Sequence, residues 1–293
     1  MGFRLIHFFT SALLLSLLAG CGGAKTGAMP PKEEAVKLMD TGENAKAAAI
    51  LEDSLAKHPD DDEAKLLLAS SYMGMAGIDV YKIFDAFKDL IFKKSLKDQI
   101  ITPHDGVADH PSLGDGAIPD QDPAKTKSEI AVAKFDKTLS TLQLALIYLD
   151  RFPQIDEEKW PLVESALATL QSMKNPAGDT FVYRVLIRLI YSKSYLVARV
   201  LRNDQLWTRE WACHFKAQDF DGDLAFFTFQ VRSIEADLVQ GAEHGVKTLG
   251  KAHKNFSTIF DAANSSGGFQ SLSQGMTFSE LENSIKGVFH CNG

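Results

Sequence analysis

Apolar residues recur at helical spacing through almost the whole chain after Pro30, and alternating, strand-like patterns are almost absent. Recurrence every three to four residues places apolar side chains on one face of a helix. The longest patterns cover residues 126–150, 156–173, 179–203 and 224–263, shorter ones cover 207–215 and 278–289, and a break falls near Gly241 or Gly245. The sequence therefore predicts an all-α fold of antiparallel helix pairs, a short solenoid merging into a helical bundle.

The first 20 residues have the layout of a secretory signal peptide. Arg4 supplies a positive charge, an apolar run extends from Leu5 to Leu18, and small residues follow. A helix that spans a membrane needs about 20 apolar residues, so this run is too short to be read as one. We therefore expect an exported protein whose leader is removed.

The segment Leu18-Ala19-Gly20-Cys21 resembles the lipobox of bacterial lipoproteins. The resemblance implies that the Cys21 sulfur receives a diacylglycerol and that the new amino terminus is acylated, with palmitate as the expected fatty acid. Several acyl chains hold a protein on a membrane far more firmly than one does. An ordinary signal peptide with an incidental Cys21 is the alternative.

The residue after Cys21 indicates to which membrane the lipoprotein is sorted. Lipoproteins of enteric bacteria that lack Asp at this place usually go to the outer membrane, and Gly22 fits that rule. We expect a cell outer-membrane lipoprotein that faces the periplasm, with surface exposure as the alternative. Residues 21–31 are small, polar or Pro and predict a flexible tether.

Residues 32–97 are predicted to form helical pairs. A helix follows Pro31, a turn contains Gly42, a second helix stops before Pro59, and a third begins behind the acidic run 60–62. This stretch resembles the tetratricopeptide repeat. With Pro59 as the closing proline, Gly42 falls at the turn, Ala47 on the small packing site and Leu51 on the large apolar site. No proline closes a second unit, and an unrelated helical hairpin is the alternative.

An apolar helix over 78–92, a long loop within residues 98–125 and a helical bundle over 126–293 complete the predicted organisation. A loop this long in a compact domain is usually functional or disordered. Its carboxylates and imidazoles suit a hard cation or zinc, but their spacing matches no defined motif, so a solvated acidic loop is favoured. The side chains concerned are His104, Asp105, Asp109, His110, Asp115, Asp120 and Asp122. We predict no metal and no cofactor.

Two cysteines remain beside Cys21, and they are Cys213 and Cys291. Two thiols in an oxidising compartment pair more often than they stay free. We therefore predict a Cys213–Cys291 disulfide that fastens the C-terminus to the middle of the domain. Two free thiols or a metal site are the alternatives.

The run Asp219-Phe220-Asp221-Gly222-Asp223 has some likeness to a calcium loop. An EF-hand needs a bidentate Glu at its twelfth position, which is occupied here by Gln, and the glycine comes too early. We instead expect these acids to end one helix and to cap the next.

Four arginines fall close to one face of the predicted 179–203 helix, with Tyr195 between them. They are Arg184, Arg188, Arg199 and Arg202. Facing a groove, this stripe would receive an anionic ligand or the acidic tail of a partner. The alternatives are a solvated face or side chains that extend over a neighbouring helix.

The chain shows no phosphate-binding loop, no zinc-protease motif and no nucleophile elbow, so we predict that it is not an enzyme. Its formal net charge of −7 argues against general nucleic-acid binding. The leading expectation is a membrane-anchored scaffold or accessory subunit of an envelope complex, with another envelope protein as its partner.

The alternative is solute binding. The architecture is similar to that of the periplasmic lipoproteins that accompany tripartite (TRAP-type) transporters, which implies an apolar or organic-acid ligand. Phe84, Phe87 and the cluster of Phe226, Phe227 and Phe229 would then line a tunnel, although such clusters more often belong to a core.

Overall fold

The computed structural model describes residues 29–78, 149, 152–200, 208–254, 256 and 277–291. All regular elements in these residues are helices, and no strand occurs among them, which confirms the predicted all-α class. The N-terminal helices are α2 (Pro31–Asp40), α3 (Asn44–Lys57) and α4 (Asp62–Met75). The later elements are the 3₁₀ turn η1 (Glu157–Lys159), α8 (Trp160–Gln171), α9 (Gly178–Tyr195), the π-helical turn η2 (Leu196–Val200), α10 (Arg209–His214), α11 (Ala217–Glu243) and α14 (Phe278–Val288).

Several predicted features lie outside the described residues. They are the signal peptide with Cys21, the apolar helix that follows Ile78, the 98–125 loop with its acids and histidines, the helix that precedes Leu149, and Arg202.

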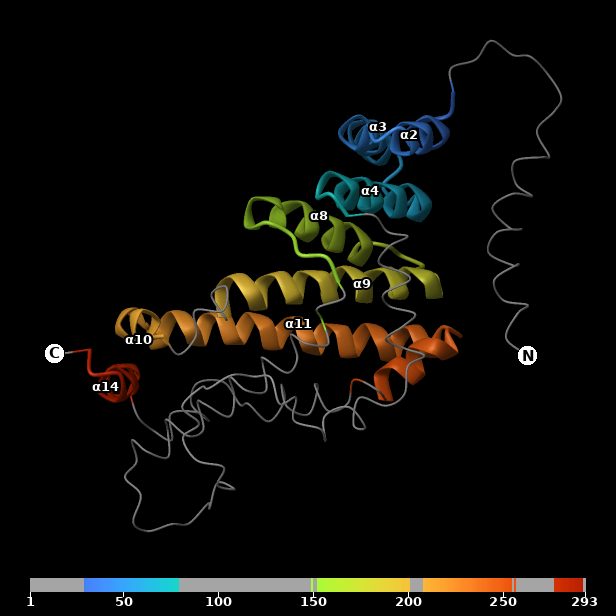
Figure 1. The fold of residues 1–293 in the computed structure, drawn as a ribbon. Helices are drawn as coiled ribbons and strands as arrows, with labels where there is room; N and C mark the ends of the chain where they lie inside the picture. Colours follow the sequence, from blue (N-terminus) through green and yellow to red (C-terminus); the bar gives the residue numbers. More distant parts are fainter. Residues whose placement is uncertain are drawn as a thin grey trace.

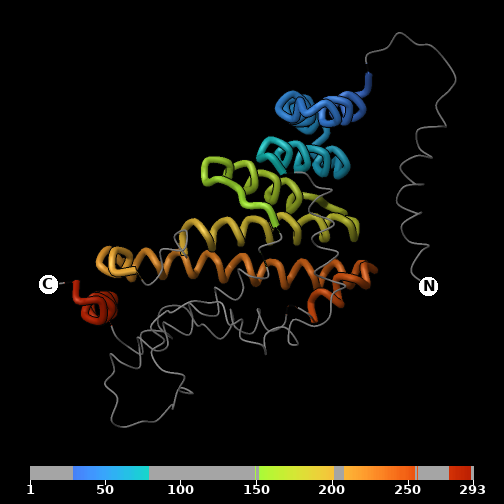
Figure 2. The backbone as a smooth tube through the Cα atoms, in the orientation of Figure 1, coloured from blue at the N-terminus to red at the C-terminus, as the bar shows by residue number. Residues whose placement is uncertain are grey.

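The helices are stacked in the order in which they occur along the chain. Figure 1 shows α2 and α3 at one end, followed by α4, α8, α9 and α11 in successive layers. Helices α4 and α8 pack directly against each other, although residues 79–148 lie between them in the sequence. The tube in Figure 2 follows the same path and shows α10 and α14 together at one end of α11. The described part is therefore a row of helical layers.

Local sequence signals set the ends of the first three helices. Pro31 opens α2, and Gly42 takes a positive φ of 80° in the turn to α3, as predicted. The Asp61 carboxylate accepts a hydrogen bond from the Ala64 N–H at 3.0 Å and so caps α4. Ala47 and Leu51 are fully buried between the helices. The resemblance to the tetratricopeptide repeat remains a prediction.

Polar contacts join this first unit to the rest of the stack. The Asp62 carboxylate accepts hydrogen bonds from the backbone N–H groups of Lys174 (3.1 Å) and Asn175 (2.8 Å), just beyond α8. Lys65, which is 7% exposed, donates to the Ser172 carbonyl at 2.8 Å. The start of α4 is thus fixed to the end of α8.

One hydrophobic cluster extends from the second half of α4 to α14. It includes Ala69 and Met73 in α4, most of the inward positions of α8, α9 and α11, and Leu281 and Ile285 in α14. Helix α9 lies in the middle, with α8 on one side and α11 on the other, and is buried over nearly its whole circumference. The side chains of α9 therefore make the contacts with α8 on one side and with α11 on the other.

The predicted break at residues 221–223 is wrong. Helix α11 runs without interruption from Ala217 to Glu243, because Phe220, Leu224 and Phe227 lie on one face and are all buried in the core. Their burial outweighs the weak helix propensity of Gly222. The later break is confirmed: Gly245 has a φ of 90°, and residues 247–254 are helical again.

Candidate functional site

The predicted arginine stripe on α9 does not face one groove. Arg188 is 3% exposed and points into the interface with α11, where its Nε donates to Asp237 Oδ2 at 2.9 Å and its Nη1 to Gln230 Oε1 at 3.0 Å. Arg184 Nη2 lies 2.5 Å from Asp237 Oδ1. The prediction that these two arginines receive an external anion is therefore wrong, since the carboxylate of α11 already occupies both.

Burial sets the electrostatics of this interface. Asp237 is 1% exposed, and loss of solvent raises the pKa of its carboxyl, while the two guanidinium groups act in the opposite direction. Burial likewise lowers the pKa of Arg184, and Asp237 opposes that shift. Among the residues that the structure describes, two cations share one anion here, and Arg184 Nε has no hydrogen-bond partner. The interface is thus a polar seam that holds α9 in register with α11.

The other two described residues of the stripe lie further along the chain: Tyr195 is the last residue of α9, and Arg199 lies in η2. The Tyr195 hydroxyl donates to Asp223 Oδ1 of α11 at 2.7 Å. Arg199 is half-exposed; its Nη2 lies 2.6 Å from Glu157 Oε2, and its guanidinium carbon lies 5.8 Å from the centre of the Trp160 ring. These two residues belong to a different cluster from Arg184 and Arg188.

Four aromatic rings from three helices meet at this end of α9. The Tyr195 ring lies 5.2 Å from that of Trp160 and 4.2 Å from that of Phe226, with interplanar angles of 29° and 32°. Tyr191 meets Trp160 and Phe226 edge to face, at 5.7 and 5.5 Å. These spacings are within the range at which aromatic pairs attract each other. Trp160 and Tyr191 are buried, whereas Tyr195 and Phe226 are half-buried and mark the side that solvent reaches.

Carboxylates surround the aromatic cluster. Tyr191 donates its hydroxyl hydrogen to Glu164 Oε1 at 2.5 Å, as Tyr195 does to Asp223. Burial raises the pKa of both tyrosine hydroxyls most, and these hydrogen bonds raise it further. Both hydroxyl groups therefore stay protonated at neutral pH. Glu157 and Arg199 also act on Tyr195, in opposite directions.

We call this group the aromatic–acidic patch. It consists of Glu157, Trp160, Glu164, Tyr191, Tyr195, Arg199, Asp223 and Phe226. Carboxylates next to aromatic rings that solvent partly reaches are the chemistry that attracts organic cations.

A π-helical turn adjoins the patch. Residues Leu196–Val200 continue α9 with the wider π spacing and carry Arg199 beside the rings. Such turns are rare and frequently mark functional sites. The sequence pattern predicted one regular helix over 179–203, because apolar spacing does not distinguish a π turn from an α turn.

Sequence reasoning identified only Tyr195 and Arg199 of the patch. For Phe226 a core position was favoured over the lining of a tunnel, and in the structure it is half-buried against the core and packs on Tyr191 and Tyr195. Its neighbour Phe227 is buried and Phe229 is 59% exposed, so the phenylalanine cluster does not share one surface. Phe84 and Phe87 lie outside the described residues.

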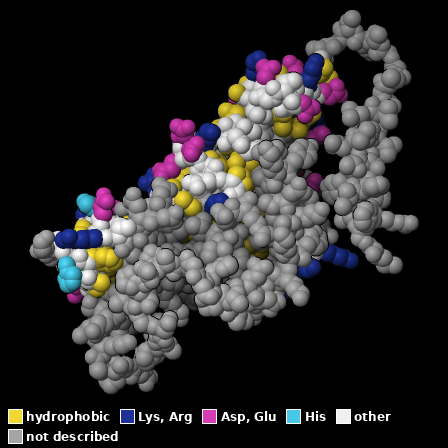
Figure 3. All heavy atoms as spheres, in the orientation of Figure 1, with side chains coloured by type: hydrophobic (Ala, Val, Ile, Leu, Met, Phe, Trp, Pro, Cys, Tyr) yellow, Lys and Arg dark blue, Asp and Glu magenta, His cyan; other side chains and the backbone are white. Residues whose placement is uncertain are grey.

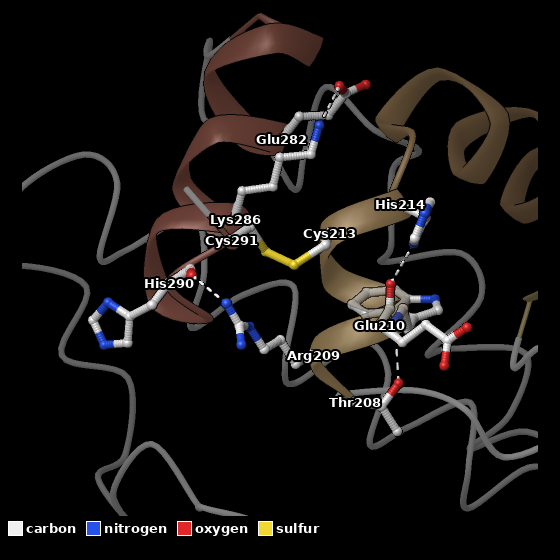
Figure 4. Close-up of a disulfide and its surroundings, with 10 residues drawn as sticks. Thr208, Arg209, Glu210, Cys213, His214, Glu282, Lys286, His290 and Cys291 are labelled. Carbon is white, nitrogen blue, oxygen red and sulfur yellow. Dashed lines mark hydrogen bonds and ion pairs between the residues drawn. A yellow bond between two sulfur atoms is a disulfide. The ribbon is translucent and has the colours of Figure 1, made fainter. Parts of the chain in front are cut away.

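The predicted disulfide is confirmed. The sulfur atoms of Cys213 and Cys291 are 2.10 Å apart and join the end of α10 to the turn after α14. Figure 4 shows Arg209 beside this bond, where its Nη2 donates to the His290 carbonyl at 3.1 Å. In Figure 3 histidine side chains lie at this same end of the stack, and acidic and basic side chains are interspersed among the described residues that are visible.

The acids around Gly222 are part of a continuous helix and not of a calcium loop. Asp223 binds Tyr195, and Gln230, at the twelfth position of the supposed loop, binds Arg188. Among the described residues no group of His, Cys, Asp or Glu side chains has the geometry of a metal site. Over the same residues, no helix combines the length and the hydrophobicity needed to span a bilayer.

Comparison with protein families, curated proteins and solved structures finds no match for this chain.

Proposed function

We propose that this chain is a periplasmic lipoprotein, anchored to the outer membrane through Cys21, that acts as a protein-interaction scaffold or accessory subunit of an envelope complex. It brings no catalytic chemistry of its own and does not bind nucleic acid. The lipid anchor keeps the helical stack next to its partner, and the tether 21–31 lets the stack orient towards it.

The packing order of the helices carries the proposal. From α2 to α11 each described layer packs on the next, so the stack buries its inner faces and leaves a long outer surface. Proteins built by such stacking use their extended surfaces to bind other proteins. The turn at Gly42 and the buried Ala47 and Leu51 agree with the tetratricopeptide resemblance, which we retain within this proposal.

Two measurements in the native host test the anchor and the partner. Radiolabelled palmitate should be incorporated into the full chain and not into a Cys21→Ala variant. A photo-crosslinking amino acid at Phe229, which is 59% exposed, should give a specific adduct with one envelope protein. That adduct should weaken in the Cys21→Ala variant, because the unanchored chain is no longer concentrated at the membrane.

Other results would contradict the proposal. Absence of palmitate from the full chain would remove the anchor. A co-purified organic acid or lipid in the native mass spectrum, without any protein adduct, would instead favour the solute-binding alternative.

A further inference from the structure

We propose that the aromatic–acidic patch is the site where the scaffold receives an arginine side chain from a basic segment of its protein partner. This inference rests on the proposed function and names the chemistry of the partner. In the free protein Arg199 occupies the site in place of that arginine.

The charge balance of the patch is the first argument. Glu157 has Arg199 as its ion-pair partner, at 2.6 Å. Within the described part of the chain, Glu164 and Asp223 accept hydrogen bonds from tyrosine hydroxyls but have no ion-pair partner. A neutral phenol satisfies the hydrogen-bonding capacity of a carboxylate without cancelling its charge. The patch therefore has an excess of negative charge that an external cation would neutralise.

The rings are the second argument. A cation above an aromatic face is attracted by the negative potential of that face, and the effect grows as water is removed. Tyr195 is held against Trp160 and Phe226 by ring contacts and by the hydroxyl bond to Asp223, so the arrangement of the three rings is fixed before a ligand binds. A fixed site loses little conformational entropy when it binds.

The structure already holds a guanidinium in this place. Arg199 lies over Trp160 and binds Glu157 at the same time, which is the arrangement a bound arginine would adopt. Its side chain is 51% exposed and that of Glu157 is 45% exposed, so the pair is held weakly and can open. A planar guanidinium both stacks on aromatic rings and pairs with carboxylates, and an ammonium does so less well. For this reason we favour arginine over lysine.

A peptide-binding assay on the full chain in non-ionic detergent tests the site. The probe is a glycine-rich heptapeptide with two arginines and a neutral fluorescent dye, and the matched peptide contains citrulline, which keeps the shape of arginine without its charge. We expect the arginine peptide to bind and the citrulline peptide to bind at least about fivefold more weakly. Equal binding of the two peptides would overturn the proposal.

Variants separate the patch from general charge attraction. Arg199→Ala frees the ring face and Glu157, so the arginine peptide should bind about two- to fivefold more tightly. Glu164→Gln with Asp223→Asn should weaken binding about three- to tenfold. The control is Glu33→Gln with Glu34→Gln, which removes the same charge from exposed positions of α2 and should change little.

Two outcomes of this series would contradict the proposal. One is an unchanged affinity in Arg199→Ala, and the other is an equal loss in the patch and α2 double variants. Circular dichroism of each variant checks that the helices are intact. Phe226→Leu, which removes one ring and no charge, provides a further variant that should also weaken binding.

An experiment in cells distinguishes this site from the scaffold itself. A photo-crosslinking residue at Ser165, which is exposed next to Glu164, should give a partner adduct that the Glu164→Gln, Asp223→Asn variant reduces. If the adduct forms equally in that variant, the patch is not the contact and the scaffold stands. If the peptide behaves as expected but no protein adduct forms from any exposed position, the patch chemistry stands and the scaffold is wrong.

Discussion

Replacement of Asp237 by Asn should destabilise the protein more than any other single change of charge in the described part of the chain. The carboxylate is 1% exposed and lies 2.5 Å from Arg184 Nη2 and 2.9 Å from Arg188 Nε. Asparagine keeps the shape of the side chain and removes its charge. The two guanidinium groups of the seam would then lie between α9 and α11 with no counter-charge.

The size of the effect follows from the burial of the two arginines. Removing one partner of a buried ion pair costs about 3–5 kcal/mol, because the remaining charge is left without compensation. Arg188 is almost fully buried, whereas the Arg184 side chain is 15% exposed and can turn towards water. We therefore expect a loss of about 3 kcal/mol in the free energy of unfolding, a large part of the 5–15 kcal/mol that is typical of a domain.

The assay is urea unfolding followed by far-UV circular dichroism, with the midpoint and the slope m both recorded. The control is Glu157→Gln, which breaks the half-exposed pair with Arg199 and should cost at most about 1 kcal/mol. If Asp237→Asn loses no more than this control at unchanged m, the reasoning about the seam is wrong.

A rescue variant separates charge from shape. Arg184→Met, Arg188→Met and Asp237→Leu together remove all three charges and keep apolar volume in the interface. Apolar replacement of buried ionic groups is often neutral or stabilising, so the triple variant should regain most of the loss. A triple variant as unstable as Asp237→Asn would show that the hydrogen-bond geometry, and not the charge, holds the two helices together.

Gly241→Ala should destabilise the protein by about 1–3 kcal/mol, because the added methyl would lie 2.2 Å from the Leu249 side chain. Gly222→Ala, on the same helix but facing open space, should stabilise the protein by about 0.5–1 kcal/mol. Thermal unfolding measures both effects. Asp62→Asn should lose about 1–3 kcal/mol at neutral pH, because two backbone N–H groups bind its carboxylate. Those bonds lower the pKa of Asp62. Its contribution to the free energy of unfolding is therefore fully present above the unfolded-state pKa of about 3.9 and is lost as the pH falls through the folded-state pKa. The urea midpoints of Asp62→Asn and of the wild type should consequently converge in acid. Reduction of Cys213–Cys291, which closes a loop with a sequence separation of 78, should cost about 4 kcal/mol, and an unchanged midpoint in reductant would contradict this.

Much of the local structure could be predicted from the sequence because it depends on neighbouring residues. Apolar spacing predicted the helical class and most helix positions, Gly42 predicted the turn between α2 and α3, the glycines near 241–245 predicted a break after α11, and an acid before α4 predicted its cap. The pairing of Cys213 with Cys291 followed from the number of cysteines and the oxidising compartment expected after export. The failure at Gly222 has a physical reason: the buried side chains on either side of it favour a continuous helix.

The tertiary structure alone decided what the polar residues of α9 do. Four arginines fall close to one face of the predicted helix, but Arg188 meets Asp237 from 49 residues away, while Arg199, in the π-helical turn, meets Glu157. Likewise, no local pattern brings Trp160, Tyr195 and Phe226 together, since they come from three helices. A hydrophobic period records which side of a helix is buried, but not which helix covers it. Which residue a charge or a ring contacts depends on which helix covers it, and this is decided only when the helices pack into layers.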